Sequence, residues 1–87
     1  MFGMNEGPFD SVEKKMHQDM MAAEGSDIDQ TWAQKMMIHH QGGIEMSQIV
    51  LEQGADPAIQ AMARKTIEEQ TKDIGELNEL LRQHQSA

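Results

Sequence analysis

Sulfur and imidazole side chains are concentrated in one short stretch of the sequence, residues 36–46. Met36, Met46 and the adjacent pair His39 and His40 all lie within it. Thioether sulfur and imidazole nitrogen are soft to borderline donors, so they suit Cu(I) or Ag(I) better than Mg²⁺ or Ca²⁺. We therefore expect these four residues to bind copper, with Cu(I) favoured and Cu(II) or Ag(I) as the alternatives.

A second group of the same donors stands earlier in the chain. Met16 and Met20 are four residues apart, which is about one helical turn, and His17 lies in that turn. This spacing lets both sulfurs reach one ion, so all three residues are further candidate metal ligands. The competing interpretation is packing alone, because methionine is a common filler of irregular cores.

Adjacent histidines on a regular helix point about 100° apart, so His39 and His40 cannot readily share one mononuclear site. We expect one ring to face inward, toward Met36 or Met46, and the other to reach toward the first helix or a second subunit. Gln70 is expected to face the same core as His40 and to accept a hydrogen bond that orients the imidazole. The alternative for Gln70 is a buried amide with ordinary hydrogen-bond partners.

The composition predicts an all-α fold and argues against several classes of partner. The 87 residues form one domain with a modest core, and only 3% of them are aromatic. A formal charge of −8 and a pI near 4.7 disfavour nucleic acid and anionic membranes as partners. The absence of cysteine excludes disulfides and thiolate sites. The sequence has no apolar run of about 18 residues, so we do not expect it to insert into a membrane. No signal peptide is recognisable.

Helix-start and helix-stop residues divide the chain into three helices. Asp followed three residues later by Glu or Gln predicts a capping box at Asp10 and at Asp27. Asp56 and Pro57 combine an N-cap with proline at the first helical position. A glycine follows each of the first two helices as the expected stop. The predicted ranges are helices 10–24, 28–53 and 57–84, within a single helical domain 10–87 that follows a flexible N-terminal segment 1–9.

The middle helix carries a stripe that we expect to face the core. Its members are Trp32, Met36, His39, Gly43, Met46 and Val50. Gly42 and Gly43 interrupt this helix, and each costs about 1 kcal/mol relative to alanine. Close approach of a neighbouring helix, or space beside the two imidazoles, would offset that cost.

The helix lengths predict the arrangement of the helices. At 1.5 Å per residue the two long helices each span about 40 Å, and the first helix spans only about 22 Å. The short helix cannot cover the whole of the long hairpin, so apolar surface is left over. We therefore expect a three-helix antiparallel arrangement, a long hairpin plus a shorter first helix, that completes a helical bundle by forming a homodimer.

The pattern resembles that of a known family. The resemblance is carried by Asp27, Asp29, Met36, His39, His40, Gly43, Ile44, Met46, Ser47, Ala63, Ile67, Gln70 and Ile74. It is similar to the bacterial domain-of-unknown-function 305 family, whose members have a ferritin-like helical-bundle fold and are often exported. The family includes periplasmic copper-binding proteins that aid copper tolerance, so the resemblance implies copper binding outside the cytoplasm. It leaves any copper-handling partner protein unidentified.

The predicted function is non-enzymatic binding of copper, or of silver, as a buffer or carrier in the periplasm or elsewhere outside the cytoplasm. Two alternatives stay open: a helical structural or interaction module with no metal role, and a haem-binding bundle with Met and His as axial ligands. Catalysis is not expected, because the Glu-x-x-His repeats of ferritin-like di-iron sites do not occur in the sequence.

Overall fold

The computed structural model describes residues 7–86, and this part of the chain is helical with no strand. Helix α1 spans Asp10–Ala22, α2 spans Ile28–Glu52 and α3 spans Pro57–Ser86. The all-α prediction is confirmed, and each predicted helix end lies within two residues of the observed one. Residues 1–6 of the predicted flexible segment lie outside the described residues. No helix between residues 7 and 86 is both long enough and apolar enough to cross a membrane.

Two of the helices begin as the sequence predicts. The Gln30 N–H donates a hydrogen bond of 2.8 Å to the Asp27 carboxylate at the start of α2. The Ala58 N–H donates a hydrogen bond of 3.1 Å to the Asp56 carboxylate, and Pro57 is the first residue of α3. Each carboxylate satisfies a backbone N–H that has no partner within its own helix.

The start of α1 differs from the prediction. Phe9, and not Asp10, occupies the N-cap position, and no side chain caps the helix there. The Asp10 carboxylate instead accepts a hydrogen bond of 2.8 Å from the Gly7 N–H. The capping-box prediction at Asp10 is therefore wrong, because the carboxylate binds the turn that precedes the helix.

The two predicted glycine stops behave differently. Gly54 has a φ of +75° directly after α2, which suits a residue without a Cβ at a helix end. In contrast, α1 ends at Ala22, before Gly25 is reached. The Gly25 N–H donates to the Thr31 hydroxyl at 2.9 Å, so this glycine holds the linker against the first turns of α2.

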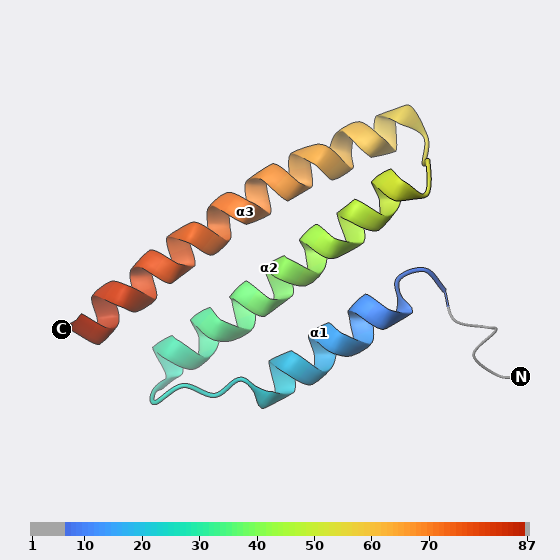
Figure 1. Cartoon of the computed structure of the whole chain (residues 1–87). Helices are drawn as coiled ribbons and strands as arrows, with labels where there is room; N and C mark the ends of the chain where they lie inside the picture. Colours follow the sequence, from blue (N-terminus) through green and yellow to red (C-terminus); the bar gives the residue numbers. More distant parts are fainter. Residues whose placement is uncertain (1–6, 87) are drawn as a thin grey trace, which may run out of the picture.

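The three helices lie side by side in one antiparallel layer, with α2 between α1 and α3 (Figure 1). In the described residues α1 packs against α2 but no Cα atom of α1 comes within 8 Å of α3. The Cα trace measures 47 × 34 × 12 Å, so the layer is one helix thick. As a result, no side chain in the described part of the chain is fully buried, with less than 2% of its surface exposed.

The buried side of α2 is rotated away from the predicted stripe. Ala33, Ile44 and Ser47 are buried, whereas Trp32 is 56% exposed and His39 is also exposed. The reason is that α2 has a neighbour on each side. Its buried positions divide between an α1–α2 seam and an α2–α3 seam, and the sides of α2 between those seams stay open.

Gly42 and Gly43 allow both neighbours to approach α2 closely. A Cβ atom on Gly42 would overlap the sulfur of Met16 in α1 and would lie 3.1 Å from its Cγ. A Cβ atom on Gly43 would overlap the carboxamide of Gln70 in α3 and would lie 2.9 Å from its Cδ and Nε2. Close approach of a neighbouring helix therefore accounts for both glycines, with one glycine for each seam.

The end of α3 is tied to the start of α2 by a hydrogen bond. His84 Nε2 lies 2.7 Å from Asp27 Oδ2. This hydrogen bond raises the pKa of His84 above its ordinary value of 6.5. The Gln30 N–H and then His84 lower the pKa of Asp27 below its ordinary value of 3.8.

We expect the free energy of unfolding to decrease as the pH rises from about 6 to about 8. Because the pKa of His84 is raised in the folded state, its contribution is full below 6.5 and is lost as the pH passes the raised pKa. Because the pKa of Asp27 is lowered, its contribution is lost only as the pH falls through that lowered value. Urea unfolding at both pH values measures the decrease. An equally large decrease in His84→Gln would contradict the assignment to this pair.

The glycines of the layer offer a direct test of the packing. Gly75 lies within α3 with nothing near its missing Cβ, so Gly75→Ala should raise the free energy of unfolding by about 1 kcal/mol. Gly42→Ala and Gly43→Ala should raise the free energy of unfolding by less, because the new methyl group displaces Met16 or Gln70. Urea titrations measure all three variants, and equal gains at the three positions would rule out the close approach.

Candidate functional site

The two adjacent histidines of α2 have different surroundings. Their ring centroids are 6.4 Å apart and their planes cross at 68°. His39 is exposed, whereas the side chain of His40 is only 16% exposed. The two rings therefore do not converge within one chain, as their adjacent positions on a helix require.

His40 is held in the α2–α3 seam by both of its ring nitrogens. Nδ1 lies 2.7 Å from the carbonyl oxygen of Met36, and since a carbonyl only accepts, Nδ1 is the donor. This leaves Nε2 facing α3, where it lies 3.4 Å from Oδ2 of Asp73. A backbone carbonyl that binds Nδ1–H is the arrangement that often leaves Nε2 of a histidine available to a metal.

Asp73 is a site residue that the sequence analysis did not identify. It follows Gln70 by three positions, so the two residues lie on one face of α3. That spacing was the available signal, but the acidic residues of α3 resemble a solvated surface when read from the sequence. The Asp73 side chain is in fact 50% exposed and turns toward the imidazole.

Gln70 does not orient His40 in the structure. Its carboxamide lies against Gly43, and its Oε1 is buried with no hydrogen-bond partner among the described residues. The partners of His40 are Met36 and Asp73 instead. The prediction for Gln70 is corrected accordingly, because its side chain fills the space above the glycine before it can reach the ring.

Met16 brings a thioether to the side of α2 that also carries His39 and Met46. Its sulfur occupies the space above Gly42. His39 precedes Gly42 by three residues and Met46 follows it by four, so the turns bearing these residues flank the sulfur. Met16 and Met46 are both partly buried, and His39 is exposed beside them.

The neighbouring residues of α1 lie differently with respect to this seam. Met20 is one turn after Met16 and partly buried, and its carbonyl oxygen accepts a hydrogen bond from Lys35 of α2. Met20 therefore lies along the same seam. His17 is exposed, and its position is about 100° around α1 from Met16, which turns it away from α2.

The predicted ligands thus divide into two sets with one residue left apart. Met16, Met20, His39 and Met46 are associated with the α1–α2 seam. Met36 and His40 belong to the α2–α3 seam with Gln70, and His17 joins neither. In residues 7–86 no group of three or more His, Asp or Glu side chains is placed to hold a metal ion. A site with several ligands in this part of one chain therefore depends on methionine sulfur.

The two histidines should contribute differently to stability. His40→Ala should lower the free energy of unfolding by about 1 kcal/mol, because it removes the hydrogen bond to Met36 and the contact of the ring with Asp73. His39→Ala should leave it nearly unchanged, since the exposed ring has no such role. Urea unfolding without metal compares the variants, and a larger loss for His39→Ala would contradict the placement of the rings.

Comparison with known proteins bears on the identity of the chain. The family model described as Domain of unknown function (DUF305) matches residues 4–81, a range that includes every candidate ligand. A search of curated proteins finds no match. The match covers most of the sequence and agrees with the resemblance found in the paired histidines and their flanking methionines. The chain belongs to the domain-of-unknown-function 305 family.

Proposed function

We propose that the protein is a non-enzymatic binder of a soft metal ion, Cu(I) or Ag(I), at the α1–α2 seam. The observation that supports this is the Met16 sulfur above Gly42, with His39 and Met46 one turn to either side. Met20, one turn along α1, is a further ligand in the proposal. Two helices thus supply sulfur and one imidazole to the same region, a donor set that suits coinage metals.

The chemistry of these ligands suits a buffer or a carrier. A thioether has no proton to lose near neutral pH, so an ion need not displace a proton from Met16 or Met46. Within a single chain the ligands are only partly buried and the ring of His39 is exposed, so an ion can reach them from solvent. Such a site exchanges its ion more readily than an enclosed one.

His40 and Asp73 support a role for Cu(II) at the α2–α3 seam. Nε2 of His40 and Oδ2 of Asp73 are 3.4 Å apart, and imidazole and carboxylate are ligands that Cu(II) accepts. In this proposal the imidazoles dominate when the metal is oxidised, and the thioethers dominate when it is reduced.

The proposed site of action is the periplasm or another compartment outside the cytoplasm. A ligand set without cysteine cannot be lost to disulfide formation in an oxidising compartment. Fractionation of cells that express the natural gene, followed by detection of the protein, tests this proposal. The homodimer expected from the helix lengths belongs to the same proposal, because a layer one helix thick leaves broad surfaces uncovered.

Titration of the metal-free protein with Ag(I) and with Cu(I) under reducing conditions tests the metal site. We expect saturable binding, at least tenfold weaker in the triple variant Met16→Leu, His39→Ala, Met46→Leu, which corresponds to about 1.4 kcal/mol or more. Leucine keeps the volume of methionine but removes the sulfur, so the packing changes little. Isothermal titration calorimetry gives the dissociation constants.

Met62→Leu is the matched control for this experiment. Met62 is 58% exposed on α3, away from the α1–α2 seam, so its loss should leave the affinity unchanged. Bound Ag(I) should also raise the unfolding temperature of the wild type but not of the triple variant. Equal affinities in the triple variant and the control, or only millimolar binding by the wild type, would favour a structural module with no metal role.

A further inference from the structure

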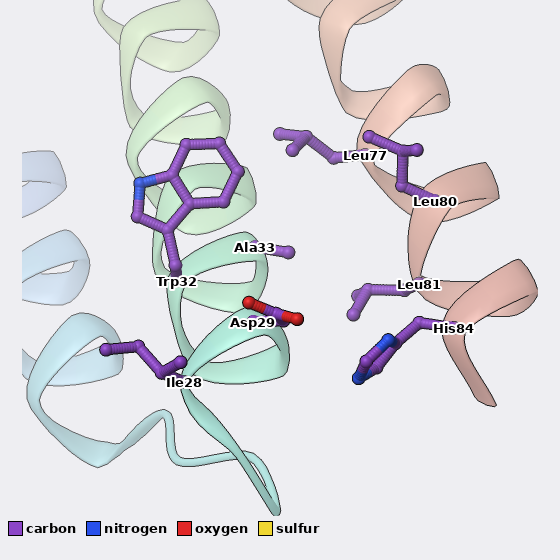
Figure 2. Close-up of a pocket in the computed structure, with 8 residues that line it drawn as sticks. All are labelled: Ile28, Asp29, Trp32, Ala33, Leu77, Leu80, Leu81 and His84. Carbon is purple, nitrogen blue, oxygen red and sulfur yellow. The ribbon is translucent and has the colours of Figure 1, made fainter.

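Three of the exposed large apolar side chains of the long hairpin, Ile28, Trp32 and Leu80, line a groove at one end of the layer. The groove has a volume of about 550 Å³ and lies between the start of α2 and the end of α3. Trp32 stands on its α2 side, and Leu77, Leu80 and Leu81 point toward it from α3 (Figure 2). Trp32 and Leu80 are 56% and 57% exposed, and Ile28 beside them is 82% exposed. So much exposed apolar surface in one place marks an interaction surface.

Apolar side chains recur on the same side at the other end of the hairpin, with Glu69 and Asp73 of α3 between the two ends. Val50 follows Trp32 by eighteen residues, and Met62 precedes Leu80 by the same number. Eighteen residues make five turns of 3.6, so each pair lies on one side of its helix. Met62 is 58% exposed. We call this side of the hairpin, defined by Ile28, Trp32 and Val50 of α2 and Met62 and Leu80 of α3, the Trp32 face.

We propose that the Trp32 face is covered by the same face of a second copy of the chain. The proposal deepens the homodimer part of the proposed function, and the dimer itself requires no metal. Because His39 follows Trp32 by seven residues, it lies on the same face, so the partner copy would cover a side of the metal site that is open in the single chain. Two copies related by a two-fold axis place two α2–α3 hairpins face to face, which makes a four-helix bundle with an enclosed core. Within the described residues the single chain has no such core, because its layer is one helix thick.

The size of the Trp32 face fits this occupant. Helix α2 is about 37 Å long and two packed helices are about 20 Å wide, which gives roughly 700 Å² per copy. A standard stable interface buries roughly 800 Å² on each partner. The apolar groove also has polar neighbours at its edge, Asp29 and His84, as the rim of an interface usually has.

The two-fold axis runs parallel to the helices in this proposal. Trp32, the largest exposed side chain, and the groove lie at the same end of the layer. An axis parallel to the helices brings these ends together and sets the indole of each copy against Leu77 and Leu80 of the partner subunit. An axis perpendicular to the helices would separate the two grooves by the length of the face.

Analytical ultracentrifugation in the presence of a chelator tests the dimer independently of metal. The wild type at micromolar concentration should have about twice the 9.8 kDa mass of one chain. Leu80→Glu should be monomeric, while Met21→Glu should stay dimeric, because Met21 is 72% exposed on α1 and outside the Trp32 face. Both variants add one negative charge at an exposed apolar position, so general charge repulsion is matched. Circular dichroism should show unchanged helix content in each variant.

Two further measurements use the composition of the chain. Trp32 is the only tryptophan, so its fluorescence should shift to longer wavelength on dilution as the dimer dissociates. The chain has no cysteine, so the double variant Trp32→Cys, Leu80→Cys should form a covalent dimer with a mild oxidant, because the proposed axis sets position 32 of each copy against position 80 of the other. The double variant Met21→Cys, Leu80→Cys should not form one. A monomeric wild type, or equal association of Leu80→Glu and Met21→Glu, would overturn the proposal. A dimer in which the double variant Trp32→Cys, Leu80→Cys does not cross-link between chains would overturn the parallel axis.

Discussion

Two adjacent residues without side chains, Gly42 and Gly43, set the spacing of the whole layer. Neighbouring positions on a helix point in directions about 100° apart, so one glycine can serve α1 and the other α3 at the same height. The Met16 thioether occupies the first space and the Gln70 carboxamide the second. The middle helix therefore lacks a side chain on two sides at the same level. The close approach of both neighbouring helices offsets the helix propensity that the glycines lose.

The same two glycines determine how the candidate ligands are distributed. His39 and His40 each lie three residues before one of the glycines, and the rotation of the helix sends one ring outward and the other toward α3. Gly42 admits the sulfur of Met16 from α1 to the side of α2 that carries His39 and Met46. The proposed metal site and the packing of the helices therefore depend on the same residues. The residues that let the helices touch also bring the donors together.

The helices were largely predictable because local signals define them. Asp27 and Asp56 bind backbone N–H groups close in sequence, and Gly54 ends α2 through its own backbone conformation. The buried side of α2 was not predictable in the same way. A single hydrophobic stripe assumes one neighbour, whereas α2 has two, so Trp32 and His39 came out exposed. Counting neighbours needs the tertiary structure, which spacing along one helix does not contain.

For the site, the residue types were visible in the sequence but their pairing was not. Gln70 was correctly placed at the α2–α3 seam, yet its carboxamide lies over Gly43 and Asp73 faces His40 instead. The choice between two polar residues one turn apart depends on which side chain the space above a glycine can hold. That is a matter of tenths of an ångström, and helical periodicity does not resolve it.

The attachment of α1 along a single seam has a consequence for dynamics. A helix with one neighbour opens at a lower free-energy cost than a helix packed on both sides, so backbone amides of α1 exchange with solvent sooner than those of α2. Each opening carries the Met16 sulfur away from Gly42. An ion that binds to both α1 and α2 would therefore stabilise the packed position of α1. Slower amide exchange along α1 would then indicate that the ion is bound.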